Sequence, residues 1–297
     1  MHSSTLASAT SPAAAARRRA GSAVWRFFRR DPLAALAALC LLLIVLMALS
    51  APLLTPYAYD RQDLEATLRG PHPAHLLGTD NFGRDVLTRV AFGARISLTV
   101  AGIAVAAEVV VGTLWGTVAG LSGGKADVWM MRVVDLLIAF PSLLLAILIT
   151  GIFGPSLVNI IVALVTTAWP GMARVVRSEV VSLREREFIE AARAAGATTG
   201  RIVGRHLVPN VLHLVAARST LDVSALILVE AALSFVGVGV QPPRPSWGLM
   251  INEAFAYLRS QPYLLAIPAV FLSLTVISLN VFGESLADAL DPYRRRR

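Results

Sequence analysis

Residues 183–196 read LREREFIEAARAAG, a polar and arginine-rich stretch between two long apolar spans. Phe188, Ala191 or Ala192, and Ala195 recur at helical spacing, which predicts a short helix with one narrow apolar face. Alanines on that face would let the backbone of a partner approach closely. A polar helix between membrane spans indicates a docking surface for another protein that supplies energy from the cytoplasmic side. The alternative is a solvated loop whose charges only set the topology.

The residues after this helix predict its end and a second short helix. Gly196 suits the left-handed backbone position that terminates a helix, where φ is positive. Thr198 or Thr199 can cap a second helix that runs to about Val208. Pro209 is expected to break that helix from the next span, at a helix start where a missing backbone donor is tolerated.

Composition places the chain among integral membrane proteins. Of its 297 residues, 56% are hydrophobic and 15% are charged, whereas soluble domains carry about 25% charged residues. The single cysteine, Cys40, lies in an apolar run, which excludes a disulfide framework and a thiolate metal cluster. The net charge of +8 comes from arginines at the edges of apolar spans. This pattern is typical of topology signals and disfavours nucleic-acid binding.

Six apolar segments are long enough to cross ~30 Å of hydrocarbon. They are residues 33–54, 96–121, 133–154, 157–173, 211–237 and 264–283. We therefore predict an all-α, polytopic membrane protein with six transmembrane helices. The first segment also resembles a secretory signal, with a candidate cleavage site at 48–50. Its apolar run outlasts the ~7–15-residue core of a signal, which favours an uncleaved anchor.

Basic residues gather before the first span, in the 174–205 stretch and at the C-terminus. This asymmetry predicts that both termini are cytoplasmic. The expected organisation is a basic tail predicted to be disordered (1–30), a first transmembrane helix with an external loop (31–95), a main transmembrane domain (96–290) with a cytoplasmic loop (183–208), and a second basic tail (291–297).

Four acidic residues interrupt apolar sequence: Glu108, Asp135, Asp222 and Glu230. An acid at bilayer depth costs ~2.5–3.5 kcal/mol, so each should face protein or water. Glu108 lies deepest in its span and is the candidate residue of a translocation path. Asp135 can pair with Arg132, three residues earlier on one helix face, and this or another structural role is favoured over contact with a substrate. A proton-coupled carrier could also use such acids, but no acid–histidine series accompanies them.

Residues 121–125, LSGGK, are similar to the signature loop of ABC ATPases. A phosphate-binding loop needs a glycine five residues before Gly124 and a Ser or Thr after Lys125. Ala119 and Ala126 occupy those two positions. We expect a tight turn between two helices and no ATP hydrolysis by this chain.

The 183–209 stretch resembles the EAA loop of the permease subunits of ABC importers. The resemblance rests on Glu190-Ala191-Ala192, on Gly196 four residues later and on Pro209. Residues 205–210, RHLVPN, are similar to the version found in the dipeptide, oligopeptide and nickel branch, with His206 and Val208 in place of the isoleucine and leucine of the general form.

Other motifs agree in chain order. LGTD at 77–80, GRD at 83–85 and GARISL at 93–98 match the entry to the second helix in that branch. EAALSF at 230–235, the glycines at 237 and 239, PP at 242–243, SWG at 246–248 and LDP at 290–292 resemble its C-type subunit. The resemblance covers the chain from about residue 76 to residue 292.

The resemblance implies a type I ABC importer permease fold in a bacterial cell membrane and a transporter subunit without its own ATPase site. It implies a homologous B-type permease, two cytoplasmic ATPases that use ATP, and an external or lipid-anchored substrate-binding protein as partners. The chain itself should bind no cofactor, metal or nucleic acid. The coupling residues implied are Phe188, Glu190, Ala191, Ala192, Ala195, Gly196, Arg205, His206 and Pro209. The 238–262 loop, with Pro242, Pro243 and Trp247, is the expected outer surface for the binding protein or the outer mouth.

A peptide is the expected substrate, because peptides prevail within this branch. Nickel chelates and glutathione-like peptides are alternatives with the same architecture. A stand-alone secondary carrier is a different class, but the chain lacks the two-half symmetry often seen there, and 183–208 would have no role. A non-transporting membrane scaffold is the remaining alternative, against which an acid in the path, Glu108, argues.

Overall fold

The structure, a computed structural model, describes residues 31–290. Within these residues it contains helices and no β-strand, apart from two isolated bridges in the loop after the first span. This confirms the predicted all-α class for the described part. The tails predicted at 1–30 and 291–297 lie outside it.

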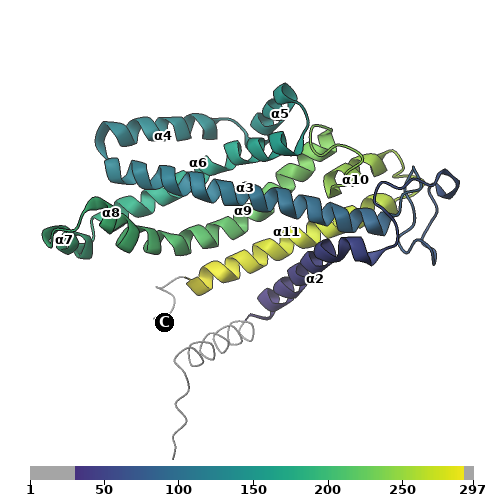
Figure 1. The fold of residues 1–297 in the computed structure, drawn as a ribbon, viewed down its shortest axis with the longest axis horizontal. Coiled ribbons are helices and arrows are strands. Elements are labelled where there is room, and N and C mark those ends of the chain that lie inside the picture. Colours follow the sequence, from purple (N-terminus) through teal and green to yellow (C-terminus); the bar gives the residue numbers. More distant parts are fainter. Residues whose placement is uncertain (1–30, 291–297) are drawn as a thin grey trace, which may run out of the picture.

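The long helices lie side by side along the longest dimension of the molecule (Figure 1). In chain order the elements are α2 (Pro32–Leu54), a 3-10 turn (Leu64–Ala66), α3 (Val86–Ser122), α4 (Gly124–Ala139), α5 (Ser142–Phe153), α6 (Leu157–Arg184), α7 (Glu187–Ala194), α8 (Thr199–Ile202), a π-helical turn (Val203–Leu207), α9 (Val208–Val236), α10 (Trp247–Phe255) and α11 (Tyr263–Leu290).

Five helices of the described part are long and apolar enough to cross a membrane, and a bent pair of helices would make a sixth span if counted as one. The five are α2, α3, α6, the continuous helix Thr199–Val236 and α11. The sixth is the pair α4 and α5, which meet at an angle of 87°. Pro141 lies at the break and keeps Phe140 extended, at φ −87° and ψ 136°. The predicted third span is therefore two helices rather than one.

Four helices extend beyond their predicted ends by several residues: α3, α6, the continuous helix Thr199–Val236 and α11. α3 begins at Val86 rather than near residue 96, because the Asp85 carboxylate accepts the backbone N–H of Thr88 at 2.7 Å and caps the helix. α6, which contains Pro170 in its interior, continues past residue 173 to Arg184. Hydropathy detects only the part of a helix that is apolar enough for hydrocarbon, so polar continuations escape it.

α3 and α6 pack closely through three glycines on one face of α3, at 112, 116 and 120. A Cβ atom on Gly116 would lie 2.4 Å from the carbonyl oxygen of Ala173. A Cβ on Gly112 would lie 2.6 Å from Cβ of Met172, so neither position accepts a side chain. Small residues one turn apart let two membrane helices approach at backbone distance.

The first and last helices are joined near the ends of their spans. Asp31 caps α2, and Ser285 of α11 donates a hydrogen bond to its Oδ2 at 2.6 Å. This bond holds the pKa of the Asp31 carboxyl below its usual value. Further along α2, Ala48 is buried against Trp247. The contacts along α2 suit the predicted uncleaved anchor.

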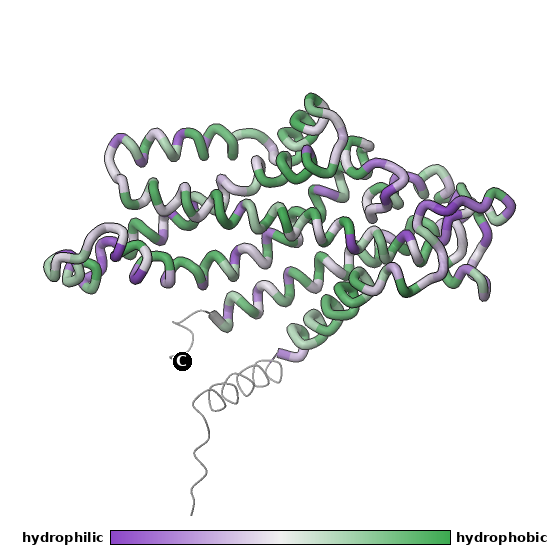
Figure 2. Tube along the Cα trace, viewed as in Figure 1, coloured by the Kyte–Doolittle hydropathy of each residue, from purple (hydrophilic) through white to green (hydrophobic). Residues whose placement is uncertain are grey.

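The two ends of the molecule are hydrophilic, and hydrophobic residues prevail between them (Figure 2). One end carries α7, α8 and the turn between α3 and α4; we call it the α7 end. The opposite end carries residues 55–85 and α10; we call it the loop end.

Candidate docking site

α7 lies just beyond the end of α6. Helix α6 stops at Arg184, and Glu185 and Arg186 redirect the chain before α7 begins at Glu187. Arg184 donates from Nη1 to the carbonyl oxygen of Gly120 at 2.9 Å, which ties the end of α6 to the end of α3. The position of α7 is thereby fixed relative to two membrane helices.

Gly196 ends α7 in the left-handed conformation that was predicted, with φ of +80°. The N–H of Ala197 bonds to the carbonyl of Ala192 at 3.0 Å, and the N–H of Gly196 to that of Arg193 at 2.9 Å. This pair of bonds is the Schellman motif. No atom lies within 4 Å of a Cβ built on Gly196, so its backbone conformation alone demands glycine.

Three buried aliphatic side chains attach α7 and α8 to the membrane helices. They are Ile189, Ile202 and Leu207, which are 0%, 4% and 0% exposed. All three belong to one hydrophobic cluster with residues of α6 and α9, including Val180 and Val211. Burial of a side chain of this size contributes about 1.5–3 kcal/mol. A displacement of α7 would therefore be passed to α6 and α9.

The outer face of α7 carries exposed apolar side chains. Phe188 is 43% exposed, and Ala191 and Ala195 are exposed on the same helical face. Ala192 is half-buried and belongs to the inner face with Ile189, so the narrow face predicted from the sequence consists of Phe188, Ala191 and Ala195. The prediction missed Ile189. Its place three residues before Ala192 was the available signal for a second apolar face.

The charged residues around this face have no partners in the described part of the chain. Seven side chains are exposed and form no ion pair there: Glu185, Arg186, Glu187, Glu190, Arg193, Arg201 and Arg205. An exposed apolar face ringed by unpaired charges of both signs has the composition of a protein-binding surface.

Pro209 lies in the first turn of α9, as predicted for a helix start, but it does not break the helix between α8 and α9, contrary to the prediction. The backbone stays helical from Thr199 to Val236 and widens into a π-turn at 203–207, where the N–H of Val208 bonds to the carbonyl of Val203. Proline offers no N–H and its ring collides with the carbonyl four residues earlier. A π-turn relieves both problems locally. Arg205 and Pro209 are exposed, and the half-buried His206 ring lies 6.0 Å from that of Phe188.

Glu108 faces protein, as expected of an acid in a span, and reaches no open surface. It is 1% exposed between α3 and α9, where it interacts with Asp222 and Arg218. Arg218 donates from Nε to Asp222 at 3.0 Å, while Oε2 of Glu108 has no hydrogen-bond partner within the described residues. In this structure Glu108 therefore does not line a path, and such a role stays a prediction.

Glu230 joins three elements in the core. Its carboxylate accepts hydrogen bonds from Ser97 of α3 and from Ser234 of α9, both at 2.8 Å. Ser246, which caps α10, is a third hydrogen-bonding neighbour. Glu230 is fully buried, so its role is to hold these elements together.

Asp135 does not pair with Arg132, contrary to the prediction. It accepts a hydrogen bond from Nη2 of Arg174 on α6 at 2.7 Å. The guanidinium of Arg132 lies instead over the ring of Trp129, 5.6 Å from its centroid. A partner on a neighbouring helix replaced the partner that the spacing along one helix suggested.

At the loop end, Trp247 is not part of the outer surface, contrary to the prediction. It is the first residue of α10 and is fully buried against α2 and α3, where Nε1 donates to the carbonyl of Val90 at 3.2 Å. Pro242 and Pro243 are exposed, as predicted, and line a groove of about 480 Å³ together with Tyr59.

The loop end is held by a charged cluster in which two buried arginines share two half-buried carboxylates. Glu253 of α10 accepts from Arg84 at 3.0 Å and from Arg89 at 2.6 Å. Both arginines also contact Asp80, at 2.6 Å for Arg84 and 3.4 Å for Arg89. The sequence prediction did not identify this cluster, in which residues of the predicted GRD motif meet α10.

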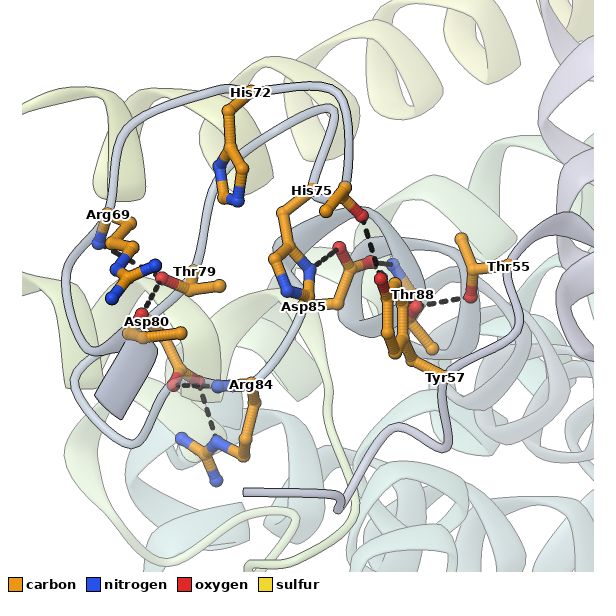
Figure 3. A network of polar contacts seen from close by, with 12 residues as sticks. Thr55, Tyr57, Arg69, His72, His75, Thr79, Asp80, Arg84, Asp85 and Thr88 are labelled. Atoms are coloured by element: carbon orange, nitrogen blue, oxygen red, sulfur yellow. Dashed lines mark hydrogen bonds and ion pairs between the residues drawn. The ribbon is translucent and has the colours of Figure 1, made fainter. Parts of the chain in front are cut away.

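A second network closes the 55–85 loop (Figure 3). His75 Nδ1 and Asp85 Oδ2 are 2.8 Å apart, and the His75 ring stacks on Tyr57. Asp85 also caps α3 through Thr88, as described above. The loop and the start of α3 therefore form one rigid cap over the loop end.

Comparison with known proteins gives two family matches. Residues 112–296 match the family described as binding-protein-dependent transport system inner membrane component. Residues 21–71 match the N-terminal TM domain of oligopeptide transport permease C.

Curated relatives match over most of their length. The dipeptide transport system permease protein DppC of Bacillus subtilis (strain 168) is 42% identical over 92% of this chain and 85% of its own. The oligopeptide transport system permease protein OppC of Escherichia coli (strain K12) is 42% identical over 93% of each. The glutathione transport system permease protein GsiD of Pectobacterium atrosepticum is 38% identical over 90% of this chain and 89% of its own.

A solved structure shares the fold. A chain of the inward-facing MetNI methionine ABC transporter superimposes with a TM-score of 0.56 at 20% identity, over 67% of this chain and 94% of that chain. At this identity the likeness concerns the fold alone. It confirms the predicted type I importer permease fold.

Proposed function

Because this chain belongs to the binding-protein-dependent transport system inner membrane component family and is a multi-pass permease subunit of an ABC importer, we propose that it carries di- or oligopeptides. Its relatives are named for dipeptide, oligopeptide and glutathione transport. Glutathione is itself a tripeptide, so all three names denote one chemical class. The relatives' high coverage, together with the match of residues 21–71 to the oligopeptide permease C domain, carries this proposal.

The proposed complex has a partner at each end. At the α7 end, two ABC ATPases would bind the exposed face of Phe188, Ala191 and Ala195 on this chain and its counterpart on a homologous B-type permease. Because Ile189 and Ile202 attach this element to α6 and α9, closure of the ATPases on ATP would tilt those helices. At the loop end, a substrate-binding protein would deliver peptide near the exposed Pro242 and Pro243.

An uptake assay tests the substrate proposal. The chain is reconstituted in vesicles with its permease partner, ATPases and binding protein, and entry of a radiolabelled dipeptide is measured with ATP on the ATPase side. We expect ATP-dependent uptake of the dipeptide and none of methionine. Uptake of nickel or methionine without uptake of any peptide would overturn the peptide assignment.

A tryptophan substitution tests the docking surface. Ala191→Trp places a large side chain on the exposed face of α7, where a close backbone approach needs a small one. We expect the ATPases to be lost from the purified complex while the partner permease is retained. Ala126→Trp is the matched control, because Ala126 is exposed at the same end but on α4. Equal retention of ATPase by both variants would argue against docking on α7.

The proposed orientation places the α7 end and both termini in the cytoplasm. In a background without Cys40, Leu64→Cys, in a loop position that is 70% exposed, should react with an impermeant thiol reagent added outside intact cells. Thr199→Cys, exposed at the start of α8, should react only after permeabilisation. The reverse labelling would invert the topology.

A further inference from the structure

A charged groove runs between α4 and α6. It has a volume of about 840 Å³, in the size range of small-molecule sites. Side chains of both signs line it together with apolar ones: Asp127, Val128, Met131, Arg132, Asp135, Leu136, Arg174 and Arg177. The fold itself does not require this groove, because α3 and α6 are already joined through their glycine face.

Two ion pairs cross the groove, and they differ in kind. Arg177 donates from Nε and Nη2 to the two carboxylate oxygens of Asp127, which is a bidentate contact. Asp127 is buried, with 9% of its surface exposed. Arg174 reaches Asp135 through Nη2 alone, and these two side chains are 51% and 62% exposed. The Arg177–Asp127 pair holds α4 against α6. The Arg174–Asp135 pair has one hydrogen bond and faces solvent, so its separation costs little stability.

The open pair lies at the level of the apolar spans. Gly112 of α3 contacts Met172 of α6, and Gly116 contacts Ala173. Arg174, the next residue of α6, therefore lies at the level of residues 112–116 of α3. At that level α3 exposes apolar side chains, with Leu114 63% exposed. Charged groups at bilayer depth face protein or water rather than lipid. An exposed Asp135–Arg174 pair therefore requires water or another protein in the groove.

We propose that the groove between α4 and α6 is part of the wall of the substrate path, and that Asp135 and Arg174 face the passing peptide. This inference rests on the proposed peptide transport. A free peptide is a zwitterion, and a carboxylate beside a guanidinium offers a partner for its ammonium and for its carboxylate. The pair closes on itself between substrates, so neither charge stays unpaired in the membrane.

Cysteine labelling tests whether the groove holds water. Leu136 and Val133 on α4 are 63% and 43% exposed, but only Leu136 lines the groove. Leu136 is also further from the turn at 122–124, so simple penetration from the α7 end would reach Val133 first. In the complete complex, freed of other cysteines, a charged thiol reagent should modify Leu136→Cys at least about tenfold faster than Val133→Cys, because only a hydrated thiol ionises readily.

Either equal rates or faster reaction at Val133 would overturn the inference, because the groove would then be no better hydrated than the face of α4 outside it. The assay needs no peptide, so it separates two failures. If Leu136→Cys reacts in a complex that takes up no peptide, the proposed substrate is wrong, but the groove is still hydrated. Peptide uptake by a complex in which Leu136→Cys stays inert would overturn the wall alone.

Substrate choice tests the contact with the peptide. Arg174→Gln should lower uptake of dialanine relative to dialanine amide about tenfold, because one charge-assisted bond to the carboxylate is lost. Arg177→Gln is the control: it removes the fastening pair and should leave this ratio unchanged. Equal losses for both dipeptides in Arg174→Gln would overturn the contact with substrate.

Discussion

The loop end and the α7 end are both polar and rich in charge, but they differ in whether the charged side chains are buried and paired or exposed and unpaired. At the loop end, Arg84 and Arg89 are 3% and 1% exposed and share the carboxylates of Asp80 and Glu253. At the α7 end, side chains such as Glu190 are exposed and unpaired within the described chain. The loop end pairs its charged groups within the chain, although Nη1 of Arg89 has no hydrogen-bond partner there, and the α7 end exposes its charged groups.

The difference follows from what each end has to do. Buried ion pairs hold a shape only when every partner is present, so the loop end is a preformed cap. Exposed charges with no internal partner contribute little to stability and are free to choose a partner. Substitutions should therefore act on folding at the loop end and on assembly at the α7 end.

The largest effect on stability is expected for Arg89→Leu. This variant leaves Asp80 and Glu253 with one arginine fewer in a buried site, and removal of one partner from such a cluster costs about 3–5 kcal/mol. Thermal unfolding of the purified protein in detergent should show a clearly lowered midpoint. Arg193→Leu at the exposed α7 end is the matched control and should stay within about 0.5 kcal/mol. Equal midpoints for the two variants would remove the contrast between the ends.

An intermediate effect is expected for Gly196→Val, which should cost about 1–3 kcal/mol of local strain because φ is +80° there. The strain should redirect α8 and abolish peptide uptake, while insertion and pairing with the other permease remain. The measurement is uptake at matched expression.

Gly200→Val provides the control for that variant. Gly200 lies in α8, four residues on, and a Cβ there also meets no atom within 4 Å, but its φ is not in the left-handed region. Uptake should therefore survive in Gly200→Val. Wild-type uptake by Gly196→Val would mean that α7 and α8 take no part in coupling.

The smallest effect on the folded chain is expected for Glu190→Lys. The residue is exposed and unpaired, so stability should change by less than about 0.5 kcal/mol. Association with the ATPases should weaken, and the loss should shrink at high salt if it arises from charge. Titration of ATPase onto the permease pair at two salt concentrations measures this. Weaker association that does not depend on salt would point to the shape of α7 rather than its charge.

Local patterns determined much of the candidate docking site. Gly196 could be predicted because a helix end with positive φ is set by the residues next to it. The outward face of Phe188, Ala191 and Ala195 follows from helical periodicity within eight residues. The spacing of Ile189 and Ala192 indicates a second apolar face of α7, but the positions of α6 and α9 decide which of the two faces is covered.

Contacts between distant parts of the chain escaped the sequence. Trp247 was predicted on the outer surface because it lies in the 238–262 loop between the last two spans, but α2 and α3 cover it completely. Asp135 was paired with Arg132 by spacing along one helix, whereas Arg174 stands opposite it on α6.

The sequence by itself determined the membrane class, the apolar cores of the spans and the end of α7 at Gly196, because hydrophobic length and backbone propensity act over one or two turns. Only the tertiary structure decided which charges are paired, which apolar faces are covered and that the third span is bent by 87°. These outcomes depend on neighbours that the chain brings together from far apart. The Arg89–Glu253 ion pair joins residues that are 164 positions apart in the sequence. A contact over such a separation produces no periodic pattern in the sequence.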